Sequence, residues 1–263
     1  DLAKIFRVVW LLPSMDRLWL EGADGRRKFL DRLTLSFFPK HADCVLNYEK
    51  AMRERNRLLK EKMTDDVWYK ALERQMAQNG LLIQSNRIAA LKKISSAQEN
   101  STTTFPIAEL SLSKTNGDLT TDEDEFVKAL SENRQLDVMA GRTLIGPHRS
   151  DMEATYKEKG ISAKDSSTGE QKAMLISIVL ANARALKLEL GYPPVILLDE
   201  ISAHLDIDRR GALYQEINAL GAQAWMTGTD KNLFSEFGCK AKYFHVIESS
   251  GISDIKEVDF SVD

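Results

Sequence analysis

The sequence predicts an α/β fold in which a helical lobe is inserted into a sheet domain. Three observations support this class. An apolar strand stands near the start of the chain, residues 26–94 have helical spacing, and strands alternate with helices toward the C-terminus. Alternating β and α elements favour a parallel sheet with helices on its faces, and a long helical stretch between strands is then an insertion.

Composition limits the protein class. The chain has 263 residues, of which 43% are hydrophobic and 29% charged, as in ordinary soluble proteins with one large domain or two lobes. No apolar run approaches the roughly 20 residues that a membrane span requires, and two cysteines make no disulfide framework. We therefore expect a cytoplasmic protein without a membrane partner. The net charge of -3 means that any nucleic-acid surface must be a local patch.

The first elements follow from apolar spacing. Residues 5–12 predict a buried strand that Pro13 ends. Helical stripes follow in residues 26–38 and 41–62, and a third helix begins at Thr64, because Asp65 and Asp66 suit a helix N-terminus. This helix is interrupted at Asn79–Gly80 and continues to residue 94. The polar stretch 95–104 predicts a surface loop.

In the rest of the chain, shorter strands and helices follow one another. We expect a strand at 105–113, an acid-started helix within 120–134, and a β-hairpin within 143–162 that turns at Lys159–Gly160. An amphipathic helix at 169–190, a fully buried strand at 195–198, a helix at 209–220 and a strand at 223–226 follow. A hairpin at 243–258 closes the order.

The strand "VILLDE" ends on two adjacent carboxylates, Asp199 and Glu200. Like charges at the edge of a core are costly unless a cation lies beside them. In a Walker B strand, Asp199 holds Mg²⁺, and Glu200 orients or deprotonates the water that attacks a γ-phosphate. The alternative is a strand that meets solvent and carries two acids on the following turn.

The stretch "SSTGEQ" opens the helix upstream of this strand. The Ser167 hydroxyl, the Gly169 backbone and a helix N-terminus together make an anion site. Ser167 with Glu170 also fits a capping box, and both interpretations can hold together.

These motifs resemble the ABC-type ATPases. "SSTGEQ" is similar to their signature motif, and "ISAHLD" is similar to their D-loop, which ends at Asp206. "AQAWMTGTD" offers Thr227 and Thr229 where transporter ATPases usually carry a switch histidine.

Further stretches resemble the RecF family of DNA replication and repair proteins over about residues 5–245. They are "MDRLWLEGADGRRKFLDRL", "YEKAMRERNRLL", "GRTLIGPHRSDM" and "LLDEISAHLDIDRRGAL". The chain departs from the family pattern at Asp24, where proline is common, and at Ser150–Asp151, where a double Asp is common.

The resemblance implies an ABC-type P-loop ATPase-like sheet domain with an inserted helical lobe. Its parts would be 1–20 in lobe I, 21–95 as helical lobe II, and 96–263 with the signature segment and the rest of the ATPase domain. The cofactors would be ATP and Mg²⁺. The implied site has Asp199 as metal ligand, Glu200 as catalytic residue, and as cofactor-binding residues Ser167, Thr168, Gly169, Glu170, Asp206 and Thr229.

The resemblance also implies the partners. Two copies would sandwich ATP head to tail, and the dimer would bind single-stranded or gapped DNA, with a preference for single/double-strand junctions, in recombinational repair and replication restart. RecR- and RecO-type mediators would be its protein partners.

None of the 14 glycines begins a Gly-Lys-Ser/Thr ending of a P-loop. The resemblance places that loop before residue 1, so we expect a chain that lacks this N-terminal segment and that binds ATP weakly or not at all by itself. Whether the chain is an enzyme therefore stays open, although the family is a DNA-dependent ATPase. Two alternatives are another ABC-class subunit, which would favour a fuller "LSGGQ" and a switch histidine, and a non-enzymatic DNA- or protein-binding module.

Several residues have two interpretations each. Asp16 is near the expected Q-loop position, or it caps the next helix. His148 and Arg149 contact nucleotide or form a structural turn, and His204 meets the opposing copy or solvent. The basic residues either bind DNA or form solvated helix faces; they are Arg26, Arg27, Lys28, Lys50, Arg53, Arg55, Arg57, Lys60 and Lys62.

Overall fold

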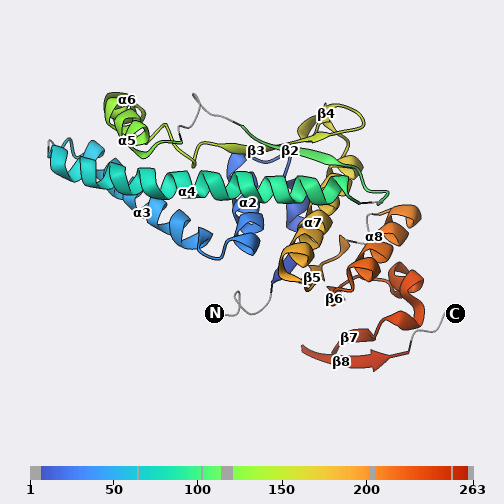
Figure 1. Cartoon of the computed structure of the whole chain (residues 1–263). Coiled ribbons are helices and arrows are strands. Elements are labelled where there is room, and N and C mark those ends of the chain that lie inside the picture. Colours follow the sequence, from blue (N-terminus) through green and yellow to red (C-terminus); the bar gives the residue numbers. More distant parts are fainter. Residues whose placement is uncertain are drawn as a thin grey trace.

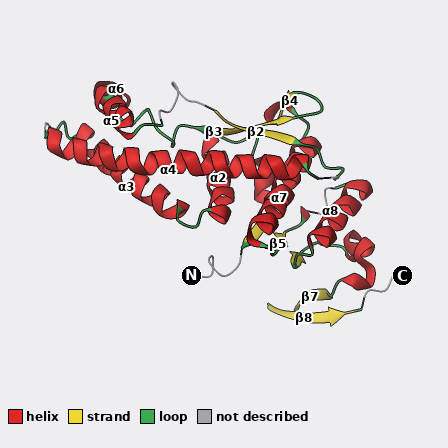
Figure 2. Cartoon of the chain, in the orientation of Figure 1, coloured by secondary structure: helices red, strands yellow, loops and turns green. Residues whose placement is uncertain are grey.

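The computed structural model describes residues 7–63, 65–101, 103–113, 121–201, 205–249 and 251–259, and it confirms the α/β class. Figure 2 shows helices gathered around small sheets. Sheet A is parallel, in the order β1 (Val8–Leu11), β5 (Val195–Leu198), β6 (Ala224–Met226). Sheet B is antiparallel and contains β2 (Ala108–Ser113), β3 (Asp151–Tyr156) and β4 (Ile161–Ser162). The expected closing hairpin is β7 (Tyr243–Ser249) with β8 (Ile252–Val258).

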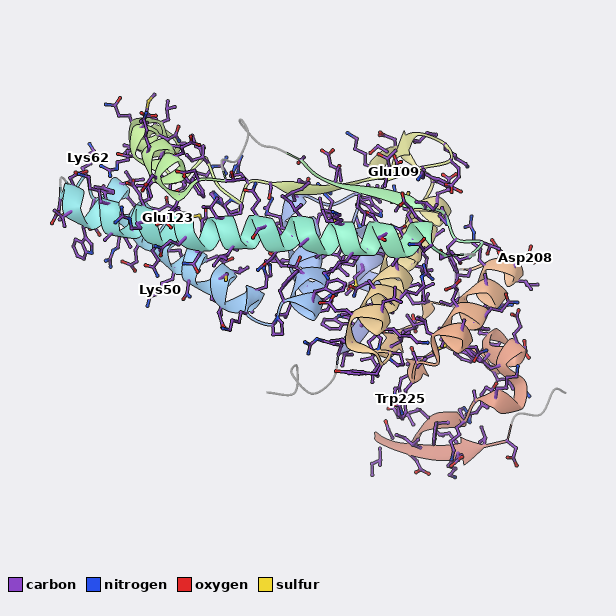
Figure 3. The ribbon with its side chains drawn as sticks, in the orientation of Figure 1. Lys50, Lys62, Glu109, Glu123, Asp208 and Trp225 are labelled. Carbon is purple, nitrogen blue, oxygen red and sulfur yellow. The ribbon has the colours of Figure 1, made fainter. Side chains whose placement is uncertain are left out.

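Sheet A has one covered face. In the described part of the chain, Ile196 and Leu198 are buried on the side of the core, whereas Leu197 is 38% exposed and Trp225 is 55% exposed. The prediction of a fully buried strand at 195–198 is therefore wrong, because alternate side chains of a strand point to opposite faces. Figure 3 shows Trp225 between sheet A and the β7–β8 hairpin in that view.

Helix α7 (Thr168–Leu190) is the centre of the core. We expected an amphipathic helix, but every residue from Gln171 to Ala183 is buried. The reason is that α4 (Asp66–Glu99), β1, α8 (Ile207–Leu220) and the 3₁₀ helix η1 (Pro13–Arg17) all pack against it. Gly191, with φ +81, ends the helix in the left-handed conformation.

Five helices together form the helical lobe. They are α2 (Ala23–Phe37), α3 (His41–Lys60) and α4 (Asp66–Glu99), which begin within the range 21–95 predicted for this lobe, and α5 (Glu123–Glu132) and α6 (Arg134–Ala140), which lie outside it. Helix α4 has 34 residues, so it is about 51 Å long. It runs from the tip of the lobe to sheet B and α7 (Figure 1). The acid-started helix is confirmed as α5, and α6 was missed.

Two predictions along α4 are wrong. The helix is not interrupted at Gly80, which serves close packing instead: a Cβ there would lie 2.8 Å from the Phe126 ring. Residues 95–99 are helical rather than a loop. Gln98 is buried because its amide donates to the Ala108 carbonyl and accepts from the Ala108 amide, both at 2.9 Å. A polar residue at this position therefore pairs with the edge of β2.

Arg55 is fully buried at the centre of the helical lobe. Its guanidinium donates to Glu73 at 3.0 Å, to Asp137 at 2.7 Å and to the Thr143 hydroxyl at 2.9 Å. These bonds join α3, α4 and α6, and a buried charge needs such partners. Arg55 is thus a structural residue, so both interpretations of it, as a DNA-binding residue and as part of a solvated helix face, are wrong.

Two shorter elements, η2 (Ala163–Asp165) and η4 (Lys231–Lys240), complete the order. No helix in the described ranges combines the length and the apolar character needed to cross a bilayer.

Candidate functional site

The acid pair lies at the carboxyl edge of sheet A. Leu11, Leu198 and Met226 are in register, so β1, β5 and β6 end together. The Asp199 amide donates to the Leu11 carbonyl at 3.1 Å. Asp199 is half-buried and Glu200 is exposed. The edge where parallel strands end is where ligands bind in open α/β sheets.

Thr227, the first residue after β6, holds both acids. Its hydroxyl donates to Asp199 Oδ1 at 2.5 Å and accepts from the Glu200 amide at 3.1 Å. Thr229, the residue expected to bind cofactor, is exposed on the loop that follows. The sequence does not distinguish the two threonines. They are two residues apart just after the strand, and side chains two residues apart along a strand point to the same side.

Glu200 has an unusual backbone. Its φ of +51 lies in the left-handed region, which costs a non-glycine residue about 1 kcal/mol or more. The hydrogen bond from its amide to Thr227 helps to hold this conformation. Such conformations concentrate at functional sites, and here the outlier coincides with the residue that the sequence selected.

The surroundings of the two acids bear on whether a metal ion could bind there. In the described part of the chain, no lysine or arginine forms an ion pair with Asp199 or Glu200, and no group of three or more His, Cys, Asp or Glu residues converges on a metal position. Mg²⁺ needs few protein ligands, since it retains water and binds substrate phosphates. One carboxylate at an open edge therefore fits Mg²⁺ that arrives with a phosphate ligand.

The turn before α7 is an exposed capping box. Ser167 caps the helix, and Glu170 Oε2 accepts from the Ser167 amide and from the Ser167 hydroxyl, both at 2.8 Å. The residues Ser167, Thr168 and Gly169 are exposed. The pKa of Glu170 is lowered to about 2, first by its bond to Lys159 and then by those to Ser167. The body of the helix is buried while its N-terminus, with free amides, faces solvent.

Arg209 joins this turn to the D-loop position. Asp206 caps α8 by accepting from the Arg209 amide at 2.8 Å, and its carboxylate lies 3.7 Å from Arg209 Nε. Arg209 Nη1 in turn donates to the Gly169 carbonyl at 3.3 Å. Sequence reasoning missed this residue; the available signal was that a cation in the first turn of a helix opposes the helix dipole. Residues 202–204, including His204, lie outside the described ranges.

Asp16 is part of η1 rather than a cap of a following helix. Its Oδ2 lies 3.0 Å from Nζ of Lys172, whose side chain is 7% exposed. Lys172 belongs to the first turns of α7, so this ion pair connects the segment after β1 to the helix that Ser167 caps.

His148 belongs to the packing of the helical lobe. Its Nε2 donates to the Thr143 carbonyl at 3.0 Å, so its Nδ1 accepts from the Tyr48 hydroxyl at 2.7 Å. Burial lowers the pKa of His148 to about 4. Gly146, with φ +127, precedes it, and a Cβ there would overlap Tyr48 Oη. The geometry supports the structural interpretation of the "GPHR" turn.

A separate cavity of about 430 Å³ opens at the tip of the helical lobe. Its lining is largely apolar, and Arg134 there is already bound to Glu73 and Asp66. Figure 3 shows Lys62, at this tip, and Asp208, in the first turn of α8, at opposite ends of the molecule. The cavity is thus remote from the acid pair, which lies at an open edge.

The comparisons with curated proteins and with solved structures both match proteins named RecF. The chain is 45% identical over 253 residues to the DNA replication and repair protein RecF of Agrobacterium fabrum, an alignment that covers 94% of this chain and 67% of the relative. It is 44% identical to RecF of Rhizobium meliloti, with coverages of 94% and 68%. No family model matches the chain.

A solved structure of the recombination mediator protein RecF with ATPrS in the RecFOR pathway has the same fold. The TM-score is 0.75 at 23% identity, over 97% of this chain and 70% of that one. The corresponding structure with ATP gives 0.73 at the same identity, over 95% of this chain and 68% of that one.

Proposed function

The chain belongs to the RecF family of DNA replication and repair proteins, and from this premise we propose that it acts as an ATP-dependent DNA clamp in recombinational repair and replication restart. In this function Mg²⁺–ATP binding closes two copies head to tail around DNA. The observation that carries the proposal is the acid pair at the edge of sheet A, which Thr227 fixes and which has no ion-pair partner among the residues that the structure describes.

Each acid has its own role. Asp199, half-buried and held by Thr227, binds Mg²⁺ directly or through water. Glu200, exposed beside it, orients or deprotonates the attacking water, which is worth about 10²–10⁴-fold in rate. The bound cation supplies positive charge beside these two carboxylates. Thr229, on the exposed loop after β6, is suited to sense the nucleotide.

The Ser167 turn acts on the nucleotide of a second copy. In support, Ser167, Thr168, Gly169 and Asp206 are exposed, and Arg209 connects the turn to the D-loop position within one chain. One copy therefore presents the Ser167 turn and Asp206 together to the nucleotide of the other copy. Glu170 belongs to this turn through the capping box. A shared site of this kind makes closure depend on ATP.

DNA binding, including that of single-stranded or gapped DNA, rests on helix α3. Arg26 is engaged with Asp151 at 2.7 Å, and Arg27 donates to the Ser150 carbonyl at 3.2 Å, so both serve the packing of α2 on β3. Four cations stay exposed along one face of α3, namely Lys50, Arg53, Arg57 and Lys60. Their spacing of three to four residues forms a stripe that suits a phosphate backbone.

RecR- and RecO-type proteins are the proposed partners, and the cytoplasm is the proposed location. The support for the partners is that the relatives of known structure are described as mediators in the RecFOR pathway.

The test is Ser167→Arg in the full-length protein. We expect ATP-dependent dimerisation, measured by sedimentation velocity, to be lost, because a long side chain would occupy the space of the partner's nucleotide. ATP binding to the monomer, measured by fluorescent-nucleotide titration, should be retained. Ser85→Arg, at an exposed serine of α4, is the matched control. A Ser167→Arg protein that dimerises like the wild type contradicts the proposal.

A further inference from the structure

The turn between β3 and β4 reaches the Ser167 turn. Tyr156 pairs with Ile161 across the hairpin, and the Gly160 amide donates to the Tyr156 carbonyl at 2.8 Å. Gly160 has φ +65, which favours glycine, so the predicted turn at Lys159–Gly160 is confirmed. This tight turn presents Lys159, whose Nζ lies 5.2 Å from the centre of the Tyr156 ring and forms an ion pair with Glu170 Oε1.

Glu170 puts a negative charge inside the turn. Its other oxygen, Oε2, already accepts from the amide and the hydroxyl of Ser167. The pKa of about 2 keeps the carboxylate ionised at every physiological pH. Because the Ser167 hydroxyl donates to Glu170, the donors left for an anion are the first amides of α7, those of Thr168 and Gly169. These donors lie within one helical turn of the Glu170 charge.

A triphosphate that approaches this turn would meet a like charge. Two anions at close range repel each other strongly when water is displaced from between them, and such juxtaposition costs affinity. Repulsion between an unpaired Glu170 carboxylate and the triphosphate would therefore oppose the closure of two copies around ATP. A cation fixed on Glu170 removes the net charge of the turn without breaking the capping box.

We propose that Lys159 is the positioning residue that neutralises Glu170 and so makes the Ser167 turn acceptable to the nucleotide of a second copy. The inference rests on the proposed function, because it concerns the same shared site. Lys159 acts through Glu170 and needs no contact with the nucleotide. Its half-exposed side chain, 49% accessible, lies on a different element from α7, so the hairpin becomes part of the ATP-dependent interface.

The experiment measures ATP-dependent dimerisation of the full-length protein by sedimentation velocity at low salt. Lys159→Ala should raise the dimer dissociation constant by about 5-fold per site, hence by roughly 25-fold in a symmetric dimer with two sites. Lys157→Ala removes the same charge from the same hairpin and is the control, since Lys157 pairs with Glu99 instead. Lys159→Arg should behave like the wild type.

The decisive arm is the double variant Lys159→Ala/Glu170→Gln. Glutamine keeps the capping box but carries no charge, so dimerisation should recover to within a few-fold of the wild type. A Lys159 with a merely structural role would not be rescued in this way. An unchanged dissociation constant in Lys159→Ala, or no rescue in the double variant, overturns the inference. Failure of the proposed function is distinct from this, because then the wild type itself would not dimerise with ATP.

Discussion

At the scale of single residues, the acid site depends on one hydroxyl. Thr227 donates to Asp199 and accepts from the strained backbone of Glu200, so it fixes the position of both carboxylates. The carboxylates follow from the sequence pattern, because an apolar strand that ends in Asp-Glu is itself the signal. The hydroxyl does not, because Thr227 reaches Asp199 only through the pairing of β6 with β5.

We predict that Thr227→Val lowers Mg²⁺-dependent ATP hydrolysis by about 10-fold. The substitution keeps the shape but removes a hydrogen bond to a charged group, which contributes about 1.5–3 kcal/mol. The measurement is steady-state hydrolysis by the full-length protein. Thr227→Ser retains the hydroxyl and should be active, and Thr229→Val tests the other threonine. A large loss in Thr229→Val with none in Thr227→Val would show that Thr229 is the functional residue.

At the scale of elements, polar and small residues decide how helices meet. Gly80 lets α4 approach Phe126, and Arg55 joins α3, α4 and α6. Neither role is visible in a helical stripe of apolar residues. In a sequence, an isolated glycine predicts an interruption of a helix, and an arginine predicts a surface position. Here close packing requires both residues.

The contact between Tyr48 of α3 and His148 predicts a pH dependence of stability. Burial, with Arg149 and Arg27 nearby, lowers the folded-state pKa of His148 to about 4, below an unfolded-state value of about 6.5. Because the folded pKa is the lower one, this contribution is complete above pH 6.5 and is lost as the pH falls toward 4. The loss should be about 2 kcal/mol by pH 5.

Urea unfolding of the wild type and of His148→Gln at pH 7.5 and pH 5.0 checks this prediction. The wild type should lose more stability between the two values than the variant does, since glutamine does not titrate. Equal losses in both proteins would mean that the buried imidazole makes no contribution.

At the scale of the whole molecule, the long α4 carries the tip of the lobe away from the sheet (Figure 1). Helix α3 lies along it, and Figure 3 shows Lys50 on the outer side of α3. Since the net charge is -3, the DNA binding that we propose requires such a local stripe. The structure reduces the number of basic residues that are candidates for DNA contact, because Arg26, Arg27 and Arg55 serve packing instead.

We predict that Lys50→Ala/Arg57→Ala weakens DNA binding and makes it less sensitive to salt. Two lost phosphate contacts should reduce the slope of log K against log salt by about 1.4 for single strands and 1.8 for duplex DNA. Fluorescence anisotropy at several salt concentrations measures this slope. Lys128→Ala/Lys240→Ala removes equal charge from α5 and η4 as a control; if both double variants behave alike, α3 is not the DNA-binding face.

The sequence by itself determined the α/β order, most element positions, the Asp199–Glu200 pair and the Ser167 cap, because each depends on residues that are neighbours in the chain. Tertiary structure decided which partners complete them: Thr227 on the acids, Lys159 and Arg209 on the turn, and the open face of sheet A. The physical reason is the distance along the chain over which each interaction acts. Hydrophobic period and capping act within a few residues, whereas ion pairs and burial form between segments that meet only when the chain packs.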